Sequence, residues 1–221
     1  MKLISALFIL LFVFVAANAQ GGHEYAPIQE KEIKYKDWTF NDYGDSDKTN
    51  LRSFAEGKKL VMVVYFAPWC PNWHNEKPVA ERLYAKYKNS GLAVIGVNEY
   101  GSLDELKSNL SESAVSFPIV VESEKRENKQ TTTHYGYRKT TGDARNWGSP
   151  YNVFLEPSKL KKKGDVLTEK TFIVNGELIE AEAEKFIRQK LGLPATETAK
   201  PVAINASKTD VCKPTIGLKK P

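Results

Sequence analysis

Cysteine and histidine are scarce in this chain, which has two cysteines and three histidines among 221 residues. Two cysteines cannot supply the several bridges that hold a small disulfide-rich scaffold together. They also lie far apart: Cys70 follows a hydrophobic run, whereas Cys212 lies in a polar tail, which is not how a structural pair is usually placed. A copper site would need Cys70, His74 and a distant histidine such as His134, but such sites use two cysteines near the start of a helix and only Cys70 is present there. We therefore expect no metal and no other cofactor.

Long hydrophobic segments are also lacking. The apolar run at residues 3–15 is shorter than the roughly 20 residues that span a bilayer as a helix. Lys2 precedes this run and the small residues Ala17 and Ala19 follow it, which is typical of a secretory signal peptide over residues 1–20. We expect an extracytoplasmic protein, secreted or periplasmic, that keeps no stable membrane anchor after cleavage.

The positive charge of the chain is concentrated near its ends. The net charge of the chain is +5, and cleavage of the predicted signal peptide would remove the positive charge of Lys2. The segment 194–221 has five lysines against Glu197 and Asp210, which leaves it at +3. The remainder is close to neutral, so a basic groove for nucleic acid is not supported. The tail itself, rich in Thr, Ala, Lys and Pro, is predicted to be a disordered basic segment because it has little apolar surface to bury.

Between the two ends the pattern predicts an α/β fold. Residues 21–36 are polar and mixed, and we expect an irregular lead-in there, followed by one domain over residues 37–193. Strands are expected at 38–40 (at an edge), 60–66, 92–97, 117–121, 151–155, 171–174 and 177–179, and helices at 51–57, 72–88, 103–110 and 181–191. The last two strands flank Asn175-Gly176, a dipeptide typical of a hairpin turn. Residues 122–146 are predicted to form a polar loop or a weak helix.

Cys70 stands at the junction between a buried strand and a helix. The run 61–66 is apolar and rich in β-branched residues, as in a strand that is covered on both faces. Backbone N–H groups and the positive end of the helix dipole favour a thiolate at such a position. We predict an exposed and reactive thiol at Cys70; the alternative is a buried, inert cysteine.

The residues around Cys70 resemble the thioredoxin superfamily. The run YFAPWC at 65–70 is similar to the active-site approach of that superfamily, and EKP at 76–78 with GLAVIGVN at 91–98 resembles its TlpA/ResA (redoxin) branch. The resemblance implies a thioredoxin-like three-layer α/β/α sandwich with a central mixed sheet. The family pattern is Trp-Cys-x-x-Cys, but Trp73 stands where the second cysteine belongs. The resemblance then implies monothiol exchange, isomerisation or mixed-disulfide capture by the one motif cysteine.

Three further residues enter the candidate site. Glu76 matches a family carboxylate beneath the active site, and its alternative is an ordinary exposed helix glutamate. Pro150, preceded by Ser149, resembles the family's cis-proline loop and would lie against Cys70; its alternative is a trans turn proline. Cys212 is a candidate resolving thiol, because a flexible tail of about twenty residues has an r.m.s. span of roughly 25 Å. A spare tail cysteine is the alternative.

Two functions of different classes are consistent with these residues. The first is a thiol–disulfide oxidoreductase with Cys70, Glu76 and Cys212 as catalytic residues and with protein or peptide thiols and disulfides as partners. The second is a redox-inactive thioredoxin-fold module that binds peptides or proteins. The residues expected to contact the substrate or peptide are Trp69, Pro71, Trp73, Pro150 and Tyr151. A peroxidase ranks lower, because Ala67 stands where a hydroxyl side chain would polarise the peroxide.

Overall fold

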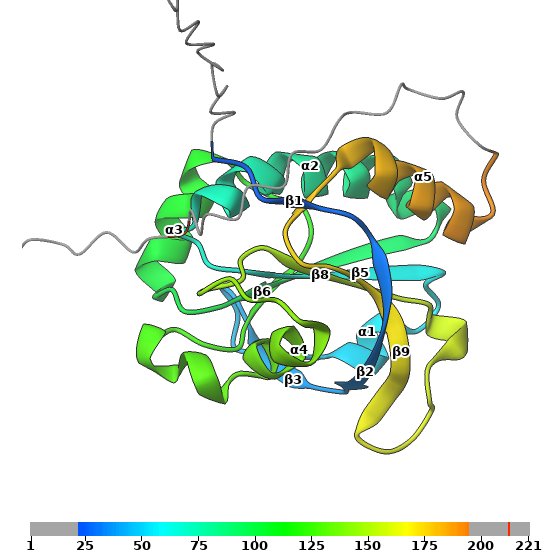
Figure 1. The fold of residues 1–221 in the computed structure, drawn as a ribbon, viewed down its shortest axis with the longest axis horizontal. Helices are drawn as coiled ribbons and strands as arrows, with labels where there is room; N and C mark the ends of the chain where they lie inside the picture. Colours follow the sequence, from blue (N-terminus) through cyan, green and yellow to red (C-terminus); the bar gives the residue numbers. More distant parts are fainter. Residues whose placement is uncertain (1–21, 195–211, 213–221) are drawn as a thin grey trace, which may run out of the picture.

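The computed structural model describes residues 22–194 and residue 212 (Figure 1). The predicted signal peptide, 1–20, lies outside the described residues. So does the predicted disordered tail, 194–221, apart from its first residue and Cys212. Within the described ranges, no helix has the length and hydropathy that crossing a membrane would require.

In the described part of the chain, eight strands form one mixed sheet in the order β2-β9-β8-β5-β6-β7-β3-β4. Their bounds are β2 (Gln29–Lys36), β3 (Thr39–Asp42), β4 (Lys48–Asn50), β5 (Leu60–Phe66), β6 (Leu92–Asn98), β7 (Ile119–Val121), β8 (Tyr151–Leu155) and β9 (Val166–Val174). Strands β5, β6 and β7 are parallel, whereas β8 runs antiparallel to both β5 and β9. The central mixed sheet predicted from the sequence is therefore confirmed.

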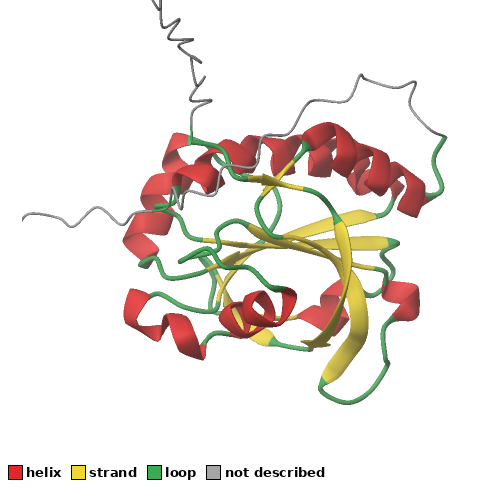
Figure 2. Cartoon of the chain, in the orientation of Figure 1, coloured by secondary structure: helices red, strands yellow, loops and turns green. Residues whose placement is uncertain are grey.

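Helices cover both faces of this sheet (Figures 1 and 2). The helices are α1 (Leu51–Ala55), α2 (Pro71–Tyr87), α3 (Leu103–Glu112), α4 (Thr133–Thr141) and α5 (Glu180–Leu191), with short 3₁₀ turns at Lys88–Ser90, Arg126–Thr131 and Pro157–Lys159. Successive β5 side chains point to opposite faces. Met62 and Val64 pack in one core cluster with α2, α3 and α5, and Val61 and Val63 pack in the other with α1 and α4. This gives the predicted three-layer α/β/α sandwich.

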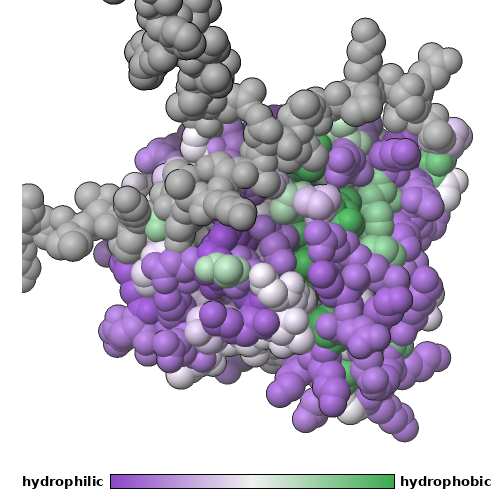
Figure 3. Space-filling model, in the orientation of Figure 1, coloured by the Kyte–Doolittle hydropathy of each residue, from purple (hydrophilic) through white to green (hydrophobic). Residues whose placement is uncertain are grey.

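Hydrophilic residues prevail on the face drawn in Figure 3, and hydrophobic ones gather mainly near α5. Phe186 of α5 packs against Phe172 of β9, with ring centroids 4.9 Å apart. The Lys190 ammonium lies 4.1 Å from the centre of the Phe172 ring, so its charged end caps an aromatic surface.

The predicted irregular lead-in at 21–36 is wrong, because this segment contains strands β1 (Tyr25–Ala26) and β2. Strand β2 pairs with β9, and its side chains alternate between solvent and core: Ile33 and Tyr35 are buried, whereas Glu32 and Lys34 are not. These two buried side chains attach one face of the edge strand β2 to the core. The sheet therefore begins before the predicted domain start at residue 37.

The expected edge strand at 38–40 is real but lies inside the sheet, because β3 pairs with both β4 and β7. The polar stretch 122–146 contains α4. Thr132 caps α4 at its start, and Gly142 follows it in a left-handed conformation (φ 80°).

The predicted hairpin across Asn175-Gly176 is also wrong. Both edges of β9 are already occupied, by β2 and β8, so no edge is left for the next strand. Strand β10 (Glu177–Leu178) instead pairs in parallel with β1 in a separate two-stranded sheet. Gly176 allows this approach, because a Cβ there would lie only 2.2 Å from the Glu24 carbonyl oxygen.

Candidate functional site

Cys70 is the N-cap residue of α2, one loop after the central strand β5. Its backbone is extended, and its carbonyl oxygen accepts hydrogen bonds from the Trp73 and His74 amides at 3.0 and 3.2 Å. Pro71 takes the first helical position, where the N–H that proline lacks would have no intrahelical partner. The predicted position of Cys70, at the positive end of a helix, is confirmed.

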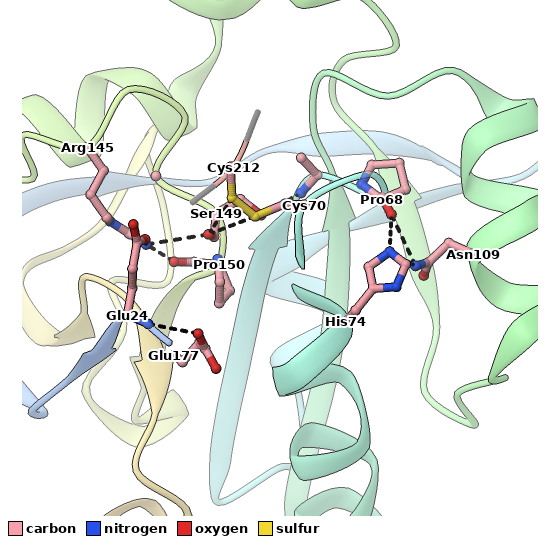
Figure 4. The surroundings of a disulfide bond; sticks show 12 residues. Glu24, Pro68, Cys70, His74, Asn109, Arg145, Ser149, Pro150, Glu177 and Cys212 are labelled. Carbon is pink, nitrogen blue, oxygen red and sulfur yellow. Dashed lines mark hydrogen bonds and ion pairs between the residues drawn. A yellow bond between two sulfur atoms is a disulfide. The ribbon is translucent and has the colours of Figure 1, made fainter. Parts of the chain in front are cut away.

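Cys70 is joined to Cys212 by a disulfide (Figure 4). The two Cα atoms are 4.8 Å apart although 142 positions separate them in the sequence. Cys70 is 0 % exposed and Cys212 is 2 % exposed. The prediction of an exposed thiol at Cys70 is therefore wrong for this oxidised form, because its sulfur is bonded to a second, equally buried sulfur. Cys212 is placed at the site, and it is not a spare tail cysteine here.

The Ser149-Pro150 peptide bond is cis, as predicted, and this loop lies against the disulfide. The Ser149 carbonyl oxygen is 3.3 Å from Cys70 Sγ and 3.4 Å from Cys212 Sγ. The Ser149 hydroxyl accepts a hydrogen bond from the Ala67 amide at 2.8 Å, which ties the loop to the end of β5. Pro150 is buried. The loop therefore presents backbone oxygen, rather than an open surface, to the two sulfurs.

Glu76 is buried, with 1 % of its surface exposed, so the alternative of an exposed helix glutamate is excluded. Its Oε2 accepts hydrogen bonds from the Leu178 amide at 2.7 Å and from the Asn152 side-chain amide at 3.3 Å. Its Oε1 has no hydrogen-bond partner among the described residues. Burial raises the pKa of Glu76 from 4.5 to about 8, although these two donors and Arg145 lower the pKa in part. At neutral pH the carboxyl group therefore holds a proton.

Two residues predicted to contact substrate face the core instead. Trp73 is fully buried on the inner face of α2, where it stacks on Phe66 with ring centroids 4.0 Å apart. Its indole N–H donates to Asn109 Oδ1 at 3.0 Å. Tyr151 is fully buried because it opens the interior strand β8. The expected contact roles of Trp73 and Tyr151 are therefore wrong for this conformation: neither side chain reaches the surface.

Trp69 and Pro71 do reach the surface beside Cys70. Trp69 is half-buried, and its indole N–H donates to the Tyr100 carbonyl oxygen at 3.1 Å. Its ring packs edge-on against Trp147, which comes from the segment before Ser149, with centroids 5.1 Å apart. Pro71 is exposed. Of the five predicted contact residues, these two are the ones that are not buried, and both are adjacent to Cys70 in the sequence.

Asn109 and Arg145 are site residues that sequence reasoning missed. Asn109 of α3 is buried and donates to the Pro68 carbonyl oxygen at 3.1 Å, and the same oxygen lies 2.9 Å from His74 Nε2 (Figure 4). Arg145 donates to the Pro150 carbonyl oxygen at 2.9 Å. Nothing local marks either residue, because each contacts the site only through tertiary structure. Across the described part of the chain, no cluster of three or more His, Cys, Asp or Glu residues is placed to hold a metal.

Comparison with known proteins identifies the class. The sequence pattern of the AhpC/TSA family matches residues 32–179, which is more than half of the chain, so the protein belongs to that family. It is 31 % identical over 78 residues to the thiol-disulfide oxidoreductase ResA of Halalkalibacterium halodurans. That match covers 35 % of this chain and 43 % of the relative, so the chain spans less than half the length of this relative. The predicted membership of a redoxin family with ResA-like relatives is confirmed.

Solved structures share the fold. A thiol:disulfide interchange protein of the thioredoxin family from Chlorobium tepidum superposes with a TM-score of 0.52 at 17 % identity, over 73 % of this chain and 98 % of that chain. A DsbF homologue from Corynebacterium diphtheriae gives a TM-score of 0.51 at 12 % identity, over 77 % and 96 %. At these identities the comparison supports the thioredoxin-like fold, which agrees with the layers described above.

Proposed function

We propose that this protein is an exported thiol–disulfide oxidoreductase whose redox couple consists of Cys70 and Cys212. One observation carries the proposal: the disulfide between these residues lies at the N-terminus of α2 and against the Ser149-Pro150 loop. A helix N-terminus stabilises the thiolate of the reduced form. A stabilised thiolate makes a disulfide easier to reduce than an ordinary structural bridge.

The reaction is a two-step exchange. In the reduced protein the Cys70 thiolate attacks one sulfur of a substrate disulfide, forms a mixed disulfide and displaces the other substrate sulfur as a thiolate. The Cys212 thiolate then attacks Cys70 Sγ, which restores the Cys70–Cys212 bond and releases the second substrate thiolate. Two electrons pass from the protein to the substrate, and a partner dithiol returns them by the reverse route.

Cys212 takes the role that the missing motif cysteine would have had. Trp73 occupies that position and is committed to the core, so it leaves no room for a thiol there. A thiol on a tether of about twenty residues is still held at an effective concentration on the order of millimolar. The predicted single-cysteine exchange then describes the first step, and the tail supplies the second.

Glu76 is proposed to handle the proton. A thiol must lose its proton to attack and a leaving thiolate must gain one, and a group with a pKa near the working pH serves both. Glu76 has a pKa of about 8 and lies on the same helix as Cys70. Its unpartnered Oε1 can hold the proton.

The compartment and the class of partner are proposed from the disulfide and from the sequence of residues 1–20. Disulfides persist in oxidising compartments, and residues 1–20 have the pattern of a cleaved signal peptide. We therefore propose a secreted or periplasmic protein whose partners are protein or peptide thiols and disulfides. Trp69 and Pro71, at the surface beside the sulfurs, would contact them.

A second candidate is a redox-inactive binding module in which the bridge is structural. The burial of both cysteines favours it, because a reductant cannot reach a shielded disulfide without a local rearrangement. The two candidates differ in reduction potential. Structural disulfides in secreted proteins are generally more reducing than about −300 mV, whereas catalytic ones are less so.

The test uses the mature protein, which has no other cysteine. It is equilibrated with thiol buffers of graded potential, quenched with an alkylating agent and analysed by mass spectrometry, and exchange with a disulfide peptide is then followed. We expect Cys70→Ser to abolish exchange and Cys212→Ser to accumulate a mixed disulfide on Cys70. A potential below about −300 mV together with no exchange would leave only the binding module.

A further inference from the structure

Arg145 shares a backbone neighbour with the redox pair. Its Nη1 lies 3.4 Å from the Ser149 carbonyl oxygen, and that oxygen is 3.3 Å from Cys70 Sγ (Figure 4). The cation and the sulfur are therefore less than about 7 Å apart, which is inside the screening length of physiological salt. Its Nη2 holds the next carbonyl of the loop, that of Pro150, at 2.9 Å.

We propose that Arg145 is a positioning residue that fixes the Ser149-Pro150 carbonyls against the disulfide and favours the thiolate of Cys70 in the reduced protein. This rests on the proposed function, because it assigns a role in tuning the same redox pair. A carbonyl oxygen that faces a sulfur opposes negative charge there. A guanidinium that draws electron density from that oxygen weakens the opposition, and the cation itself attracts the thiolate.

Arg145 is anchored for this role by two buried carboxylates. Its Nε and Nη2 donate to Asp143 at 3.0 and 2.8 Å, and its Nη1 lies 3.2 Å from Glu24 Oε2. Only 14 % of its side-chain surface is exposed. Hydrogen bonds from Arg145 keep the pKa of Asp143 below its usual value in spite of burial. A planar guanidinium presents five donors in a fixed fork, so it can hold a carboxylate and two carbonyls in a defined geometry that a flexible lysine ammonium does not impose.

Other charged groups lie near Arg145 or on the same helix as Cys70, and they contribute to the electrostatic potential at the Cys70 sulfur. Arg138 donates to Asp143 at 3.1 Å, so that carboxylate is shared between two cations. On α2, His74 is exposed beside the Pro68 carbonyl, and Glu76 is buried and subject to the charges of Arg145 and Glu177. Removal of Arg145 takes one positive charge away from Cys70 and leaves the negative charges of Asp143 and Glu24 less fully compensated, so both effects raise the pKa of the Cys70 thiol.

The consequence for redox chemistry follows from the proton balance. Reduction of the bridge adds two electrons and gives two thiol groups, which take up two protons unless one stays a thiolate. A stabilised Cys70 thiolate stabilises the reduced form and makes the pair more oxidising. Loss of Arg145 should therefore make the bridge harder to reduce.

The experiment measures the ionisation of Cys70 directly. Reduced protein is alkylated with iodoacetamide over a range of pH, and the modification of Cys70 and of Cys212 is quantified separately by mass spectrometry. We expect Arg145→Met to raise the pH midpoint for Cys70 and to lower its alkylation rate at neutral pH by about tenfold, which corresponds to about one pKa unit. The potential should become more reducing by about 30 mV for each tenfold change.

Two comparison variants separate charge from general disruption. Arg145→Lys keeps the charge but loses the fixed fork of donors, so its midpoint should lie between those of the wild type and Arg145→Met. Arg82→Met removes one positive charge from an exposed ion pair with Glu180 and should leave the midpoint unchanged. If Arg145→Met does not fold, Glu24→Gln tests the same idea in the opposite direction, because loss of that carboxylate should lower the midpoint for Cys70.

An unchanged Cys70 midpoint in Arg145→Met, or in Glu24→Gln if the former is unfolded, would overturn the role of Arg145 even in an active oxidoreductase. A shifted midpoint in a protein that exchanges no disulfides would support Arg145 and refute the proposed function. The two failures are therefore distinguishable.

Discussion

Replacement of Glu76 by glutamine should make the protein more stable, and the gain should depend on pH. Glu76 is 1 % exposed, and burial raises its pKa from 4.5 to about 8. Between these values the unfolded chain has released this proton whereas the folded chain still holds it. The folded state binds more protons, so the stability of the wild type falls as pH rises through this window.

The magnitude follows from the width of the window. Each pKa unit corresponds to about 1.4 kcal/mol, so the full cost of burying this acid is on the order of 5 kcal/mol above pH 8. About two-thirds of it, or about 3 kcal/mol, applies at neutral pH. Glutamine is uncharged, and its oxygen can still accept the hydrogen bond that the Leu178 amide donates at 2.7 Å. Its extra N–H groups need partners, which reduces the gain by about 1 kcal/mol or more.

Chemical denaturation at a series of pH values measures this effect. The difference in unfolding free energy between Glu76→Gln and the wild type should be small or unfavourable near pH 4.5 and should grow steadily up to about pH 8. Glu182→Gln, at an exposed position on α5, is the matched control and should give parallel curves. A difference between Glu76→Gln and the wild type that does not vary over this range would refute the view that Glu76 is buried with its proton.

Three further changes test other parts of the structure. Trp73→Ala should lower the unfolding free energy by about 3–5 kcal/mol, because it removes a fully buried ring, and a loss below 1 kcal/mol in urea titration would contradict its place in the core. Cys212→Ser opens a bridge with a sequence separation of 142, and should lower the stability of the oxidised protein by up to about 5 kcal/mol; excess reductant should erase the difference in denaturation midpoint. Ser102→Ala removes the capping box at the start of α3 and should cost about 1 kcal/mol, with helix loss near Ser102 seen as faster amide exchange; unchanged exchange there would argue against the cap.

The local elements were largely predictable, because their signals lie within a few residues. The apolar run of β5 requires two covered faces, and the sheet has helices on both. Ser102 and Glu105, three positions apart, form a capping box at the start of α3, and Gly192 ends α5 in a left-handed conformation. Strand β2 also had a local signal, in the alternation of Ile33 and Tyr35. Its lysines and glutamates concealed that signal because only one face of this edge strand is buried.

The site was predictable only in part. The sequence by itself determined that a cysteine would follow the central strand at a helix N-terminus, because the apolar run and the helix-period segment are adjacent in the chain. That a proline loop would face this cysteine was implied by the family resemblance of Ser149-Pro150. Tertiary structure decided the rest: β9 had no free edge for a hairpin, Trp73 turned to the core, Cys212 reached Cys70 across 142 positions, and Arg145 reached the proline loop. The hydrophobic periodicity of a sequence indicates which face of a helix or strand is apolar. It does not indicate which residue from a distant part of the sequence packs against that helix or strand, because this contact depends on how the whole chain folds.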